Sequence, residues 1–178
     1  MEELNTPVQR PKGLFTPVQR PKGLFTLLIL TFINTGSAIL FGILTLLFFK
    51  PTEADLNKER VDMAKSIVEL KELGLNSLVD LLERVQAMTE VLNGYFYETN
   101  IINIIIALLG AASAYFMLKR NHLGFHGYIV YNLLSSGSLY FFVSPSLIPS
   151  VILIFNLVVS LVFVLLYAKH LKWMKGEV

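Results

Sequence analysis

The chain has 178 residues, of which 54% are hydrophobic, and its formal net charge at pH 7 is only +2. Its mean hydropathy of +0.60 is too high for an ordinary soluble domain, whose residues are about 45–50% apolar. The small net charge gives no indication of a nucleic-acid partner, and the lack of cysteine excludes disulfides, thiolate metal sites and a cysteine nucleophile.

The N-terminal arm, residues 1–23, carries a repeated segment. TPVQRPKGLF occupies positions 6–15 and again positions 16–25. Ten identical residues in a row indicate a tandem duplication of the coding sequence or an artefact of sequence assembly. The arm is rich in proline and polar residues, a composition typical of flexible segments.

The first long apolar segment, residues 24–49, contains no charged residue and is bracketed by Lys22 and Lys50. At about 1.5 Å per residue a helix of this length extends about 39 Å, enough to cross a hydrocarbon core of about 30 Å. The segment is too long and begins too late for a cleaved signal peptide. It therefore predicts a first transmembrane helix that remains as an anchor.

The connection at 50–100 predicts an amphipathic helical hairpin. Thr52 is a candidate N-cap with the acidic Asp55 in the first turn, and Gly74 is a candidate helix stop. A second helix is expected from Ser77 to Gly94. The apolar stripes of the two helices are expected to face each other, the membrane surface or another protein. The residues of the expected partner-binding surface are Leu56, Met63, Ile67, Leu70, Leu78, Leu81, Val85, Met88 and Leu92.

Three further apolar segments predict an all-α membrane protein with four transmembrane helices and the hairpin between the first two. The third span is short and contains Asn132 and the polar cluster 135–138, so it needs partner helices to satisfy these groups. The predicted segments are a second span at 101–118, a loop at 119–127, a third span at 128–143, a turn at 144–146, a fourth span at 147–168 and a tail at 169–178.

The distribution of charge predicts the orientation of these spans. The arm, the 119–127 loop and the tail are basic, whereas residues 50–100 hold six basic and ten acidic residues. The positive-inside rule then places both termini and the short loop in the cytoplasm and the hairpin outside. The expected topology and lipid-contact residues are Arg10, Lys12, Arg20, Lys22, Lys119, Arg120, Lys169 and Lys172.

No Asp, Glu, Lys, Arg or His lies inside a predicted span, which argues against a pump or a proton-coupled transporter. Each span instead contains one asparagine, and small residues follow helical spacing on the first and second spans. These groups are expected either to join helices or to line a polar path. The expected helix-packing residues are Asn34, Ala38, Gly42, Asn103, Ala107, Gly110, Ala111, Ala114, Asn132 and Asn156.

The sequence shows no known catalytic motif. His122 and His126 are four residues apart, but Gly124 lies between them in an expected loop and no carboxylate is near. With His170 they map to a membrane edge, where a juxtamembrane role is expected. We therefore predict no catalytic residue, metal, cofactor or enzyme activity, although an enzyme or redox subunit would need one of these histidines to bind a group.

The entry into the first span, RPKGLFTLLILTFINTGSAILFGILTLL, resembles the start of small, uncharacterised bacterial integral membrane proteins with four predicted helices. In those proteins a proline-rich polar arm leads into a span with Asn, Gly and Ser at its middle. The resemblance covers the arm and first helix and implies a location in the bacterial inner membrane. It implies no activity.

These observations lead to two functional hypotheses. The first is a non-catalytic accessory or scaffolding subunit of a larger inner-membrane complex, which binds other membrane protein subunits through small-residue helix faces and the hairpin. The alternative is a pore or carrier for a small solute, formed by self-association and lined by intramembrane Asn and Ser. Membrane lipids are expected as partners in both, a homo-oligomer in the second, and nucleic acid in neither.

Overall fold

The computed structural model describes residues 21–176. All regular structure within these residues is helical, and they contain no strand. Most of the N-terminal arm, with the first TPVQRPKGLF copy and Arg10, Lys12 and Arg20, lies outside the described residues.

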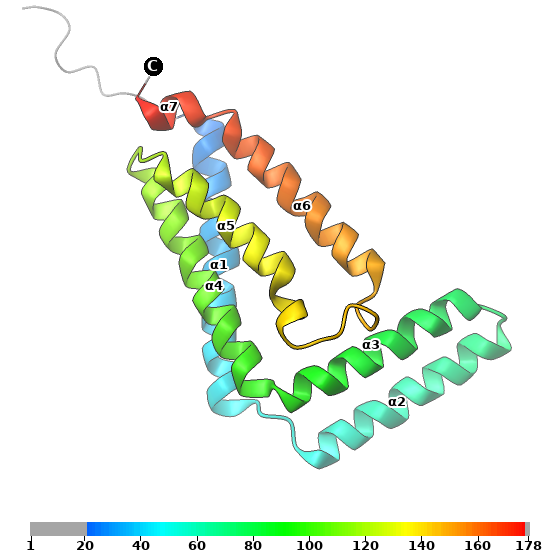
Figure 1. Ribbon diagram of the computed structural model, residues 1–178. Helices are drawn as coiled ribbons and strands as arrows, with labels where there is room; N and C mark the ends of the chain where they lie inside the picture. Colours follow the sequence, from blue (N-terminus) through cyan, green and yellow to red (C-terminus); the bar gives the residue numbers. More distant parts are fainter. Residues whose placement is uncertain (1–20, 177–178) are drawn as a thin grey trace, which may run out of the picture.

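Three helices form the long elements of the bundle (Figure 1): α1 (Lys22–Phe48), α4 (Phe96–Leu118) and α6 (Ser150–Ala168). Each is long and apolar enough to cross a membrane, and they are the three described helices with that property. The chain is therefore a membrane protein, and its regular structure in residues 21–176 is all helical. The helix α4 begins five residues before the predicted second span, at Phe96, because Glu98 in its first turn favours a helix start.

The predicted third span at 128–143 differs from the structure. The helix α5 (Leu123–Gly137) begins within the segment expected to be a loop, because the side-chain Oδ1 of Asn121 accepts a hydrogen bond from the Leu123 N–H at 2.9 Å. It ends at Gly137 and continues as a 3₁₀ turn, η1 (Ser138–Phe141). His126 therefore lies on a helix rather than in a loop.

The connection between α1 and α4 forms two helices, α2 (Glu53–Glu72) and α3 (Asn76–Gly94). They pack side by side and extend away from the bundle, across the direction of the long helices (Figure 1). Gly74 lies at their junction with a φ of 72°, a conformation that glycine adopts readily. Ion pairs join the helices, with Arg60 Nε 3.1 Å from Glu90 Oε1 and Lys71 Nζ 3.3 Å from Glu83 Oε1.

Thr52 caps α2 as the sequence predicts. Its backbone N–H donates to Asp55 Oδ2 at 3.0 Å, and its Oγ1 accepts from the Asp55 N–H at 3.3 Å. This reciprocal pair satisfies two backbone donors at the start of the helix. Hydrogen bonds from the Thr52 side chain and backbone lower the pKa of the Asp55 carboxyl.

We expect Asp55→Asn to loosen the first turn of α2. The lowered pKa means that the carboxylate contributes stability above its unfolded-state pKa, and that this contribution is lost as the pH falls through the folded-state value. Amide hydrogen-exchange protection of residues 53–57 should therefore fall in Asp55→Asn at pH 7, and in the unmodified chain at acid pH. Asp62→Asn, which changes an exposed carboxyl in the middle of α2, is the matched control. Equal protection in both variants would contradict the capping role.

Two apolar clusters hold the bundle at its two ends, called here the hairpin end, where α2 and α3 lie, and the α7 end. At the α7 end, the short helix α7 (Leu171–Lys175) folds back over the long helices. The buried residues there are Leu24, Leu27, Leu28, Ala114, Met117, Phe125, Tyr128, Tyr167, Trp173 and Met174. At the hairpin end, Met88 of α3 packs with Val143 and Ile148 of the segment before α6. The candidate site lies between these clusters.

Arg120, expected from the sequence only as a topology residue, is part of the packing at the α7 end. It adopts a left-handed conformation with a φ of 57°, and the N–H groups of Arg120 and Asn121 bond back to the carbonyls of Met117 and Phe116. These are the two hydrogen bonds of a Schellman motif. The Arg120 guanidinium lies 5.0 Å from the Trp173 ring, and its Nε donates to the Trp173 carbonyl at 3.2 Å. The residue therefore joins the end of α4 to α7.

Candidate functional site: a polar cavity between α1, α5 and α6

A cavity of about 410 Å³ lies between α1, α5 and α6 and is open on one side. Three of the four predicted intramembrane asparagines line it, each from a different helix. Hydroxyl groups from the same helices complete the polar surface. The lining residues are Leu30, Thr31, Asn34, Tyr128, Tyr131, Asn132, Ser135, Ser136, Phe155, Asn156, Val159, Ser160 and Phe163.

The cavity exists because α4 holds α1 and α5 closely but leaves α6 apart. A Cβ added at Gly124 of α5 would lie 2.5 Å from the backbone N of Met117 and 2.5 Å from the carbonyl O of Ser113. A Cβ at Gly110 of α4 would lie 2.8 Å from the Tyr131 ring. The Gly124 distances are to backbone atoms, so the backbones of α4 and α5 approach each other closely there, whereas Gly110 leaves room for the Tyr131 ring. By contrast, only 6% of the most apolar stretch of α6 is buried, against 33% in α4.

The helix α6 is held mainly at its two ends. At the α7 end, Tyr167 is fully buried, its hydroxyl lies 2.7 Å from Thr31 Oγ1, and its ring packs edge-on against Tyr128 at 4.7 Å between centroids. At the hairpin end, the segment before α6 packs on α3. Residues 154–159 between these anchors are exposed. The middle of α6 therefore contributes one side of the cavity without closing it.

Hydrogen bonds within the chain satisfy part of the polar surface. Asn34 Nδ2 donates to the Tyr131 hydroxyl at 3.2 Å, which joins α1 to α5. Asn132 Nδ2 donates to the carbonyl of Tyr128 at 2.8 Å, within α5. These two amides are thus held by the protein itself.

The Asn156 amide differs from the other two. Like Asn34 it is exposed, but no side-chain hydrogen bond joins it to another of the described residues 21–176. Asn34 and Asn156 line the same cavity, but no hydrogen bond joins them. An amide without a partner in hydrocarbon costs several kcal/mol, so at this depth a hydrogen bond to water or to a neighbouring molecule would stabilise the Asn156 side chain.

Asn103, the fourth predicted asparagine, does not line the cavity. It lies seven residues before Gly110 and therefore on nearly the same side of α4. Gly110 is buried against Tyr131 and Thr35, yet Asn103 is exposed. The face of α4 that packs inside the bundle is thus open toward the hairpin end.

The predicted small-residue stripes lie partly at helix contacts. Ala107 and Ala114 of α4 are buried, and Ala111 is half-buried. A Cβ at Gly42 of α1 would lie 2.7 Å from Cγ1 of Ile104, so this glycine lies where α1 contacts α4. Ala38 is exposed.

The predicted partner-binding residues of the hairpin mostly lie between its helices or against the bundle. Ile67 and Met88 are buried, and Leu78 is exposed. The others are half-buried: Leu56, Met63, Leu70, Leu81, Val85 and Leu92.

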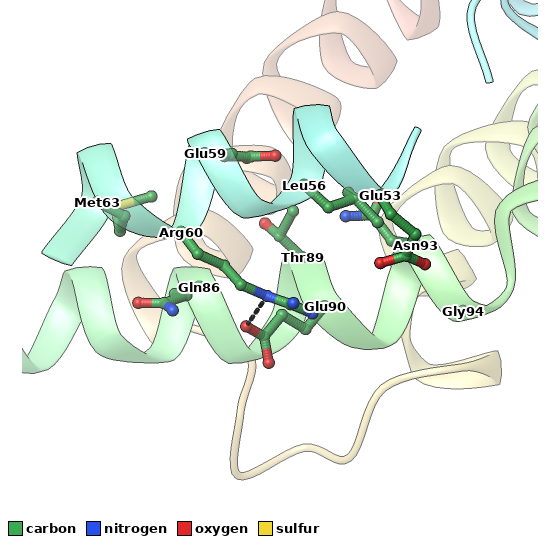
Figure 2. A pocket seen from close by; sticks show the side chains of 10 residues that line it. All are labelled: Glu53, Leu56, Glu59, Arg60, Met63, Gln86, Thr89, Glu90, Asn93 and Gly94. Carbon is green, nitrogen blue, oxygen red and sulfur yellow. Dashed lines mark hydrogen bonds and ion pairs between the residues drawn. The ribbon is translucent and has the colours of Figure 1, made fainter. Parts of the chain in front are cut away.

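A second, smaller pocket of about 250 Å³ lies between α2 and α3 (Figure 2). Leu56 and Met63 give it an apolar side, and the Arg60–Glu90 ion pair crosses it. Glu53 and Glu59 also line it. The described residues contain no group of three His, Asp or Glu that could hold a metal ion.

The histidines lie near the α7 end. His126 Nδ1 is 3.1 Å from the carbonyl of His122, and the two rings meet edge-on at 6.0 Å between centroids. His170 precedes α7, where burial and then the charge of Lys169 lower its pKa.

Sequence reasoning missed the tyrosines and glycines of α5. Gly124 and Gly127 let α5 approach α4, and Tyr128 and Tyr131 then face α1 and α6. The signal was the spacing at i, i+3, i+4 and i+7, which places all four on one face of a helix. It was obscured because residues 123–127 were assigned to a loop.

The cavity has the chemistry of neutral hydrogen bonding. No residue that lines it is Asp, Glu, Lys, Arg or His, so the cavity holds no side chain that is charged at neutral pH. Amides and hydroxyls of this kind suit an uncharged polar group, such as the side chain of a neighbouring helix or a neutral solute. Comparisons with protein families, with curated proteins and with solved structures give no significant match, so the function is inferred from the site itself.

Proposed function

We propose that this protein is a non-catalytic accessory or scaffolding subunit of a larger membrane complex. The observation that carries the proposal is the polar cavity left open along a scarcely packed α6, with the free amide of Asn156 at mid-helix. A partner helix with an Asn, Gln, Ser or Thr at the same depth would complete the cavity. Such a contact would satisfy the amide and cover the exposed middle of α6.

The proposed arrangement in the membrane has four spans. The α5 helix and η1 form a continuous helical run, 15 residues of α5 followed by four of η1, and at about 1.5 and 2.0 Å per residue this run covers about 30 Å. Together with α1, α4 and α6 it gives an even number of spans. The basic charges of the arm, the α4–α5 turn and the tail then favour both termini in the cytoplasm and the hairpin outside. The resemblance of the first span to those of small bacterial membrane proteins implies that this membrane is the bacterial inner membrane.

A pore or carrier for a small neutral solute is the second candidate. It is favoured by the amide and hydroxyl groups from three helices around one cavity. In this role the cavity would be completed by another copy of the chain and would contain water and solute rather than a partner's side chain.

Leucine substitutions of Asn34 and Asn156 separate these functions. We expect Asn156→Leu to weaken a complex with a partner subunit by about 3- to 18-fold, the equivalent of one interhelical hydrogen bond of about 0.6–1.7 kcal/mol. It removes no hydrogen bond within the described chain, whereas Asn34→Leu also removes the bond to Tyr131. Asn103→Leu is the matched control, because Asn103 is an exposed asparagine outside the cavity.

The measurement is extraction of the full chain from its native membrane in mild detergent, followed by sizing and identification of the co-migrating proteins. A stoichiometric foreign subunit that Asn156→Leu releases and Asn103→Leu retains supports the accessory role. A homo-oligomer or a lone 20.1 kDa chain contradicts it. Solute flux in vesicles that Asn156→Leu abolishes would instead support the pore or carrier.

A further inference from the structure

The tip of the hairpin carries apolar side chains that remain partly or largely exposed. Leu73, which follows the last residue of α2, has 71% of its surface exposed. Leu75, just before α3, and Leu78, in its first turn, have 43% and 45% exposed. Val68, one turn before the end of α2, is 54% exposed. Exposing several neighbouring leucines to water is unfavourable. The stability of the tip therefore depends on whether water or an apolar medium surrounds it.

The start of α6 gives the level of the membrane boundary. The helix has 19 residues and is therefore about 28 Å long, barely enough to cross a hydrocarbon core of about 30 Å. If α6 shifted along its axis, one of its ends would leave the hydrocarbon core and the other end would no longer reach across it. The preceding residues, Ser144 to Ser146, are exposed and not helical, a backbone that belongs outside the hydrocarbon. Ser150 thus lies at the boundary.

The helix α3 lies at this same level. Ser77, Asp80 and Arg84 of α3 share a small cavity of about 190 Å³ with residues 149–151, the start of α6. Leu75 and Leu73 come only two and four residues before Ser77 along the chain. In Figure 1 the hairpin passes the lower end of α6 and its tip reaches beyond the bundle, where no other described helix lies.

We propose that the tip of the hairpin, Leu73, Leu75 and Leu78, inserts into the interfacial region of the lipid bilayer beside α6. The inference rests on α6 crossing the membrane and not on the polar cavity or its partner. Leucine side chains at interfacial depth bury their apolar surface among lipid, as those of interfacial helices do. The nearby acidic residues Glu72 and Asp80 favour zwitterionic over anionic lipid. The insertion would hold the hairpin parallel to the membrane surface.

The lack of cysteine in the chain allows a direct test. Single cysteines at Leu73, Leu75 and Leu78, each carrying a nitroxide spin label, are introduced into the full chain. The protein is reconstituted at one copy per nanodisc in phosphatidylcholine. Collision with oxygen, which concentrates in lipid, is compared with collision with a water-soluble nickel chelate. Lys65→Cys, an exposed position in the middle of α2, is the matched control.

At the tip we expect the oxygen collision rate to exceed the nickel rate, and at position 65 we expect the reverse. Adding Leu73→Ser and Leu75→Ser to the chain labelled at position 78 should shift its ratio toward that of position 65. A tip as accessible to nickel as position 65 would overturn the proposal. Protection from both reagents would also overturn it, because it would show the tip buried against protein.

Discussion

Tyr167→Ala should release α6 from the bundle and lower the free energy of unfolding by about 3–5 kcal/mol, the usual cost of removing a fully buried aromatic ring. Tyr167 has no exposed surface, and it is the one buried residue of α6. Its hydroxyl lies 2.7 Å from Thr31 Oγ1 of α1, and its ring packs on Tyr128 of α5. One side chain thus joins three helices at the α7 end.

The expected loss at Tyr167 is measured by unfolding of the purified full chain in mixed micelles as the fraction of denaturing detergent rises. Tyr167→Phe separates the contribution of the ring from that of the hydroxyl, because it keeps the ring. Loss of the hydroxyl alone should lower the free energy of unfolding by about 0.6–1.7 kcal/mol. Tyr115→Ala, on a ring that is 49% exposed, is the matched control. If Tyr167→Ala cost no more than Tyr115→Ala, α6 would have to be held elsewhere.

Gly124→Ala is expected to separate α5 from α4 at a cost of about 1–3 kcal/mol, the range for overpacking a tightly packed interior. The added methyl group would lie 2.5 Å from two backbone atoms of α4, the Met117 N and the Ser113 O. A flexible side chain could turn away, but a helix backbone cannot. The whole helix must shift, and Tyr128 and Tyr131 must shift with it.

The same unfolding measurement tests this prediction, with Gly36→Ala as the control. Gly36 lies in the middle of α1, and a Cβ there would meet no atom within 4 Å, so this change should be neutral or stabilising by up to about 1 kcal/mol through helix propensity. Because Tyr131 holds Asn34, Gly124→Ala should also weaken partner retention. Equal stability of the two alanine variants would refute the close approach of α4 and α5.

The position of α5 shows where local sequence patterns fail. Hydropathy predicted a span at 128–143, because the polar and glycine-containing segment before it has few apolar residues. The structure begins the helix at Leu123, where Asn121 accepts the first N–H and the two glycines pack on Ser113 and Met117. The packing of the two glycines is a contact with another helix, and the hydropathy of the local sequence carries no information about such a contact.

The sequence by itself determined the three long apolar helices, the start of α2 at Thr52 and its end near Gly74. The apolar helices depend on the length of an apolar run, and the start of α2 depends on a cap three residues from its partner. The end of α2 depends on a glycine that adopts a positive φ, so all of these signals lie within a few turns of the chain. The tertiary structure alone decided that Asn34, Asn132 and Asn156 share one cavity and Asn103 does not. It also decided that α6 stays apart and that Arg120 packs on Trp173. The physical reason is that such contacts depend on how helices distant in sequence cross and on their positions along their axes. The close contacts at Gly110 and Gly124 fix this arrangement.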